Sequence, residues 1–103
     1  MIALIEDNRP AIEALCRRYG VSCLEVFGSA ADDTFDPKTS DLDFLVTFGP
    51  PEGVMDAADQ YFGLLFDLEA LFARRIDLVC AKAMRNPYFI RSVNAGRRVL
   101  YAA

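Results

Sequence analysis

The sequence predicts a small mixed α/β domain, and three stretches carry that prediction. Residues 42–48 alternate apolar and polar side chains, which is the period of a strand with one buried face. Residues 54–73 place apolar side chains at helical spacing. Residues 76–80 return to the period of a strand. This mixture of strands and helices is typical of a sheet packed against helices.

Composition limits the class of protein. The chain has 103 residues, which suits one domain spanning 1–103 with a modest core. Hydrophobic residues make up 53% and the net charge is −4, so we expect a globular protein without general affinity for nucleic acid. Cys16, Cys23 and Cys80 lack metal-ligand spacing and suit reduced thiols. No apolar run approaches the roughly 18 residues of a membrane span, so we expect a cytoplasmic protein.

The first predicted helix runs from Asn8 to Tyr19. Asn8 suits its N-cap, and Gly20 suits its C-terminal stop. Helical spacing directs one group of side chains toward the core: Ile12, Leu15, Cys16 and Tyr19.

A predicted strand over 21–27 ends at a Gly-Ser dipeptide. Gly28 has no Cβ, so a ligand can approach its backbone closely. Ser29 suits the start of a short helical turn, whose free N–H groups would face an anion such as a triphosphate. The alternative is an ordinary turn that ends the strand.

Two carboxylates share one face of the next predicted strand, Asp41 to Phe48. Asp41 and Asp43 alternate with the apolar residues Leu42 and Phe44, and lie roughly 7 Å apart along an extended chain. Like charges at that separation repel, and a hard divalent ion with oxygen ligands would neutralise them. The alternative is a solvated sheet face.

The helix predicted over 54–73 has an unusually wide apolar arc of roughly 220° at about 100° per residue. A surface helix in a small domain needs about half of that width. The arc therefore favours a second surface, covered by another copy of the chain or by a partner protein. The alternative is that neighbouring elements of the same chain cover it.

A third strand is predicted over 76–80, with Asp77 on one face. If this strand lies beside the second one, Asp77 completes a cluster with Asp41 and Asp43. The alternative is a salt bridge from Asp77 to Arg74 or Arg75. After this strand, Asn86 and Pro87 suit the start of a short helix that Gly96 ends, and residues 99–101 suit a final strand.

These residues resemble a family. Gly28-Ser29, followed by Asp41-Leu42-Asp43 and later by Asp77, is similar to the Gly-Ser and Asp-x-Asp signature of the DNA polymerase β-type nucleotidyltransferases. The short chain resembles the minimal nucleotidyltransferase (MNT) branch, often the antitoxin of a HEPN–MNT toxin–antitoxin pair. The likeness extends to the tail over 86–101. One departure is Ala30, where many relatives have Arg.

The resemblance implies a nucleotidyltransferase fold and Mg²⁺-dependent transfer of AMP from ATP. It implies two Mg²⁺ ions held by Asp41, Asp43 and Asp77, with Asp77 also accepting the proton of the acceptor hydroxyl. Gly28 and Ser29 would contact the β- and γ-phosphates.

The acceptor would be a hydroxyl of a HEPN-type toxin. A chain of this size has no separate substrate domain, so another molecule must present the acceptor. The alternative is a non-catalytic antitoxin or adaptor that neutralises its partner by binding and has a vestigial metal site; the residue at Ala30 favours this view.

Overall fold

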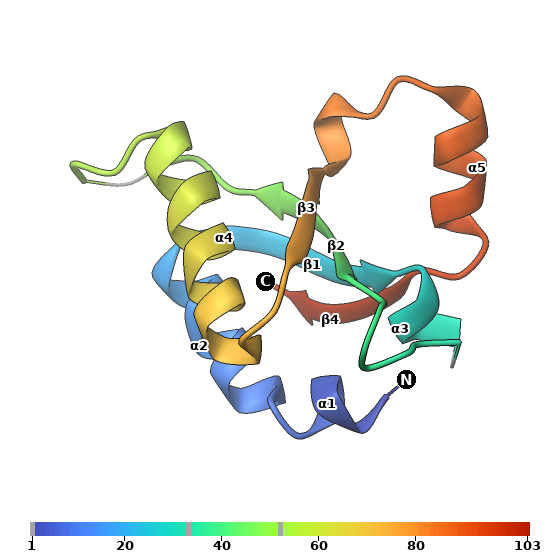
Figure 1. Cartoon of the computed structure of the whole chain (residues 1–103). Helices are drawn as coiled ribbons and strands as arrows, with labels where there is room; N and C mark the ends of the chain where they lie inside the picture. The colour runs from blue at the N-terminus through green and yellow to red at the C-terminus, as the bar shows by residue number, and fades with distance from the viewer. Residues whose placement is uncertain (1, 33, 52) are drawn as a thin grey trace.

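A four-stranded sheet forms the centre of the molecule (Figure 1). The computed structural model describes residues 2–32, 34–51 and 53–103. The strands lie in the order β3-β2-β1-β4, with β1 antiparallel to both β2 and β4. β2 and β3 are parallel, and helix α4 connects them. The strand bounds are β1 Val21–Phe27, β2 Leu42–Phe48, β3 Ile76–Cys80 and β4 Arg98–Ala102.

Helices lie on both sides of this sheet (Figure 1). Their bounds are α1 Ala3–Glu6, α2 Arg9–Arg18, α3 Ser29–Asp32, α4 Ala57–Phe72 and α5 Pro87–Asn94, with a 3₁₀ turn at Ala81–Ala83. Asp56 and Asp59 cap α4 reciprocally: the Asp56 side chain accepts from the Asp59 amide, and the Asp59 side chain accepts from the Asp56 amide. Asn86 accepts from the amides of Tyr88 and Phe89, which confirms it as the N-cap of α5.

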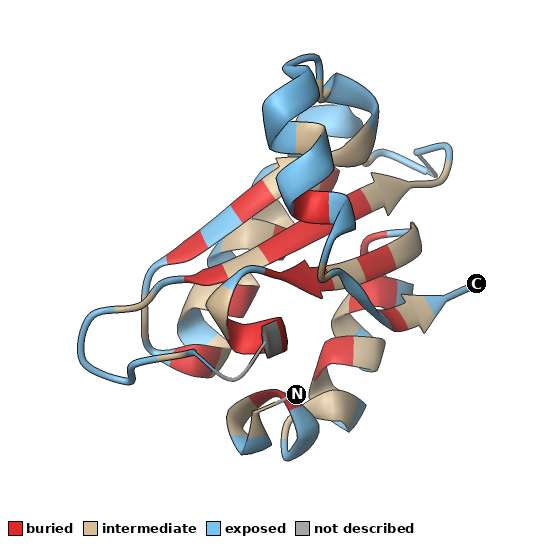
Figure 2. Cartoon of the chain, turned by 90° about the vertical axis from the view of Figure 1, so that its right-hand side faces the viewer, coloured by how far each residue is buried: buried red, intermediate tan, exposed pale blue. Residues whose placement is uncertain are grey.

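The helices on the two faces of the sheet differ in burial, and α5 is mostly exposed (Figure 2). α2 and α4 pack on one face, over a large core that includes Phe44, Leu24 and Leu64. The other face carries a small cluster in which Phe27, Leu45 and Val93 are buried, and Val93 comes from α5. Most of the hydrophobic stabilisation therefore comes from the side of α2 and α4.

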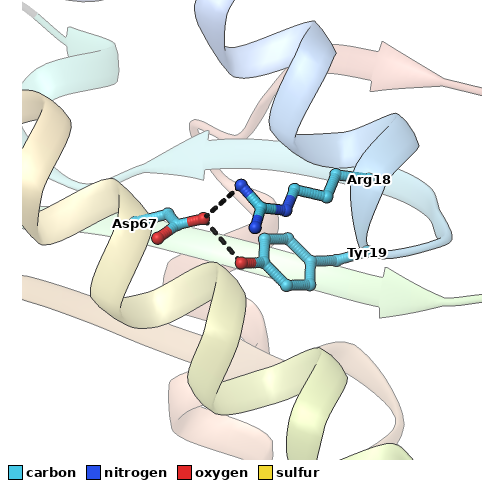
Figure 3. A network of polar contacts seen from close by, with 3 residues as sticks. All are labelled: Arg18, Tyr19 and Asp67. Atoms are coloured by element: carbon cyan, nitrogen blue, oxygen red, sulfur yellow. Dashed lines mark hydrogen bonds and ion pairs between the residues drawn. The ribbon is translucent and has the colours of Figure 1, made fainter. Parts of the chain in front are cut away.

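A polar contact joins the two large helices (Figure 3). The hydroxyl of Tyr19, just after α2, donates to the Asp67 carboxylate of α4 at 2.6 Å. Arg18 lies 3.7 Å from the same carboxylate oxygen. The Tyr19 ring packs so closely on Gly63 that a Cβ there would collide with it.

One polar residue of α4 faces the interior, whereas two of its aromatic residues face solvent. Gln60 is buried, and its side-chain amide donates to the carbonyls of Tyr19 and Gly49. Phe62 and Phe66 are instead 50% and 59% exposed. Neighbouring elements of the chain therefore leave part of the apolar arc of α4 uncovered.

The N-terminal helix also differs from its prediction. A separate short helix, α1, precedes α2, and Asn8 lies between them. The Asn8 side chain does not cap α2; it donates to the carbonyl of Leu4 at 2.8 Å. Within the described ranges, no helix is long and apolar enough to cross a bilayer.

Candidate active site

Asp43 and Asp77 come together because their strands are neighbours. The parallel register of β2 and β3 pairs Asp43 directly with Asp77. Side chains alternate along each strand, so Asp43 shares a face with Leu45, and Asp77 shares one with Val79. Leu45 and Val79 belong to the small cluster, so both carboxylates lie on the face opposite α2 and α4. β3 therefore lies beside β2, which is the neighbour relation that the prediction for Asp77 required.

Asp41 lies immediately before β2 and is exposed. Its charge still reaches Asp43. Partial burial, the charge of Asp77 and the charge of Asp41, in decreasing order, raise the pKa of Asp43 from 3.8 to about 6. Electrostatically, the three carboxylates therefore form one group centred on Asp43.

The Gly28 turn lies against this group. β1 pairs Phe27 with Asp43, which brings the following residue beside the carboxylate. A Cβ built at Gly28 would lie 2.5 Å from Oδ2 of Asp43, and Gly28 also has a φ of +71°. Only glycine satisfies both conditions without strain. The half-buried Ser29 begins α3, so the Gly-Ser dipeptide and Asp43 are neighbours.

No salt bridge joins Asp77 to Arg74 or Arg75, so that alternative is wrong. The Arg74 guanidinium instead lies over the Phe35 ring at 5.0 Å and donates to the Pro37 carbonyl at 3.4 Å. Arg74 thus holds the segment that leads to Asp41. The repulsion between Asp43 and Asp77 is left for another cation to relieve.

The oxygen donors suit a hard divalent ion such as Mg²⁺ in their chemistry. Burial, followed by the charges of Asp77 and Asp41, raises the pKa of Asp43, and a bound cation would offset the repulsion between these charges. Among the side chains that the structure describes, which lie in residues 2–31, 34–51 and 53–103, no three acidic or thiol groups are gathered closely enough to hold an ion together. The site therefore has the ligand chemistry of a metal centre without a preformed three-ligand cage.

Two features near the site were not apparent from the sequence. Ala30 is fully buried in the large core, so an arginine there would have to displace packed side chains. Tyr61, expected only as part of an apolar stripe, donates its hydroxyl to the Leu78 carbonyl at 2.7 Å. That bond joins α4 to β3 beside Asp77. The only feature of the sequence that pointed to this hydrogen bond was the presence of a tyrosine within an apolar stripe.

Comparison with known proteins agrees with this arrangement. The family model described as a nucleotidyltransferase domain matches residues 9–100. A candidate protein adenylyltransferase of Methanocaldococcus jannaschii is 30% identical over 76 residues, which is 74% of this chain and 73% of the relative.

Solved structures share the fold. One of a protein assigned as a minimal nucleotidyltransferase is 28% identical, with a TM-score of 0.72, over 94% of this chain and 95% of that one. An MNT antitoxin complex with a tri-AMPylated HEPN toxin, from Shewanella oneidensis, aligns at 18% identity and a TM-score of 0.62, over 95% of this chain and 72% of that one. The match over residues 9–100, together with the paired aspartates beside a Gly-Ser turn, shows that the chain belongs to the nucleotidyltransferase domain family.

Proposed function

We propose that this nucleotidyltransferase transfers AMP from ATP to a hydroxyl group of a HEPN-type toxin and thereby acts as its antitoxin. One observation carries the proposal. The parallel register sets Asp43 opposite Asp77, directly beside the Gly28 turn. The related protein adenylyltransferase and the antitoxin complex with an AMPylated toxin support the same reading.

The proposed ligands of two Mg²⁺ ions are Asp41, Asp43 and Asp77. Bound Mg²⁺ would supply positive charge against the triphosphate and acidify the acceptor hydroxyl. Gly28 and Ser29 would contact the β- and γ-phosphates, where the missing Cβ of Gly28 permits close approach.

The reaction is a substitution at the α-phosphorus of ATP. A bond forms between the acceptor oxygen and this phosphorus, the bond to the β-phosphate oxygen breaks, and pyrophosphate leaves. Asp77 accepts the proton of the hydroxyl. Asp77 suits this role because it is exposed on the strand at the sheet edge, where an acceptor can approach.

A second candidate is an antitoxin that acts by binding alone. Two observations favour it: the buried Ala30 gives no cation for the phosphates, and the described carboxylates form no ready three-ligand cage. The Gly28 turn and the paired aspartates have no evident role under this candidate, so we place it second.

The test uses the chain, ATP labelled at the α-phosphate, Mg²⁺ and the purified protein encoded by the adjacent gene. We expect label on that protein, and none with Asp41→Asn plus Asp43→Asn or after chelation with EDTA. Asp7→Asn, which alters an exposed acid on another element, is the matched control and should transfer normally. If the double variant blocks the toxicity of the neighbouring protein as well as the wild type does, the binding candidate replaces the enzyme.

A further inference from the structure

The exposed face of α4 has aromatic rings at its centre. Phe62 and Phe66 stack on each other with ring centroids 6.0 Å apart, and the Tyr61 ring meets Phe62 edge-on at 5.1 Å. About half of each phenylalanine is exposed. Exposed apolar groups gathered in this way mark interaction surfaces more often than single ones do. We call Phe62, Phe66 and the flanking acids Asp59 and Glu69 the α4 ridge.

The ridge carries negative charge at both ends. Asp59 precedes Phe62 by three residues, and Glu69 follows Phe66 by three, so all four lie on one side of the helix. The two acids lie about 15 Å apart at the helical rise. α4 contains no lysine or arginine. Asp67 belongs to a different side, where Arg18 and the Tyr19 hydroxyl already contact it.

A shallow groove runs between α2 and α4, next to the ridge. Its volume is ≈ 540 Å³, and Arg18 and Asp67 line it beside the apolar residues Ala11, Ala14, Leu15, Ala70 and Leu71. Ala70 lies one helical turn after Phe66, so groove and ridge form a continuous surface. The small side chains on both helices leave space for the apolar side chains of another helix.

We infer that the α4 ridge and this groove bind the acceptor protein through an amphipathic helix with Lys or Arg on both sides of its apolar stripe. This inference rests on the proposed function. The charge pattern selects a partner over a second copy of the chain, because an antiparallel pair of α4 helices would place Asp59 of each against Glu69 of the other. A basic helix instead forms complementary pairs at both ends.

The position of the ridge suits delivery of an acceptor. Tyr61 contacts Phe62 and also donates its hydroxyl to the Leu78 carbonyl of β3. β3 is the edge strand of the sheet, and Leu78 directly follows Asp77. A protein seated on the ridge therefore borders this edge strand and reaches the Asp77 carboxylate, on the opposite face of the sheet, by extending around the edge.

The test measures the affinity of the full chain for the purified protein encoded by the adjacent gene, by calorimetry at low and high salt. Phe62→Ser plus Phe66→Ser should weaken binding at least 10-fold, and the matched control Val99→Ser, on β4, should change it less than 2-fold. Glu69→Lys should weaken binding about 3-fold or more at low salt only. Asp7→Lys, with the same charge change elsewhere, should not.

The outcomes separate this inference from the proposed function. Normal binding and AMP transfer by the Phe62/Phe66 variant would overturn the inference and leave the function standing. Binding lost in that variant, with normal Mg²⁺–ATP affinity and melting temperature, would support it. A wild-type dimer in sedimentation that the same variant dissociates would assign the ridge to a second copy. If the wild type neither binds nor modifies the neighbouring protein, both proposals fail.

Discussion

Asp43 and Asp77 occupy paired positions on neighbouring parallel strands, and the nearby Arg74 contacts Phe35 and Pro37 instead of these carboxylates. Partial burial first, and the charges of Asp77 and Asp41 after it, raise the pKa of Asp43, so the ionised carboxylate destabilises the fold. The two neighbouring carboxylates lower the free energy of unfolding, so replacing one of them should stabilise the protein. The gain in stability measures what the protein gives up to keep the pair.

Asp43→Asn should stabilise the metal-free protein at pH 7.5 by about 1–2 kcal/mol. The pKa of Asp43 is raised from 3.8 to about 6 in the folded state, so the folded protein binds the proton more tightly than the unfolded chain. Wild-type stability from this group is therefore present below pH 4 and lost as the pH rises through 6. Urea unfolding across this range should show the advantage of the variant vanish near pH 4. An equal advantage at pH 4 and 7.5 would contradict this account.

Gly28→Ala should destabilise the fold by about 1–3 kcal/mol and abolish nucleotidyl transfer. The new Cβ would meet Oδ2 of Asp43 at 2.5 Å, in a backbone with φ of +71°. Gly96→Ala is the matched control, because a Cβ there meets nothing within 4 Å. Thermal unfolding and the transfer assay check both effects, and a Gly28→Ala protein with wild-type melting temperature and activity would refute the contact.

Tyr19→Phe should cost about 1 kcal/mol of unfolding free energy, because it removes the 2.6 Å bond to Asp67. The same bond raises the pKa of the Tyr19 hydroxyl, since the deprotonated form cannot donate. Activity should stay normal, because this hydrogen bond lies on the face of the sheet covered by α2 and α4, opposite the carboxylates. A double-mutant cycle with Asp67→Asn should give a clear coupling energy, and strict additivity would show that the bond contributes nothing.

Ala30→Arg should destabilise the protein by about 3 kcal/mol or more and should not raise activity. Ala30 is fully buried, so the larger charged side chain would overpack the core or lose its hydration. Ala3→Arg, at an exposed position of α1, serves as the control and should be close to neutral. A stable and more active Ala30→Arg variant would show that the position can serve the phosphates after all.

The sequence predicted the strands better than the helix environments. β1 and β3 have the predicted bounds, because their alternation ends abruptly at Gly28 and after Cys80. The family and the mixed sheet were also predicted correctly. α1 was missed because four residues are too few to show a helical period. The burial of Gln60 could not be predicted, because its acceptors, the carbonyls of Tyr19 and Gly49, come from distant parts of the chain.

The candidate site was predictable as a set of residues but not as an arrangement. Spacing placed Asp41 and Asp43 together, whereas the position of Asp77 depended on which strand lies beside β2. The contact between Gly28 and Asp43 likewise depends on the antiparallel register of β1 and β2. Their catalytic and metal-binding roles stay predictions until the variants above are assayed.

Parallel pairing of β2 and β3 has a consequence for how the chain matures. Because α4 must cross over before the two strands can meet, Asp77 reaches Asp43 only after the whole connection has formed. A nascent chain that has emerged from the ribosome only as far as β2 therefore carries Asp43 without Asp77 beside it. Such a chain lacks the carboxylate pair on which the proposed transfer depends.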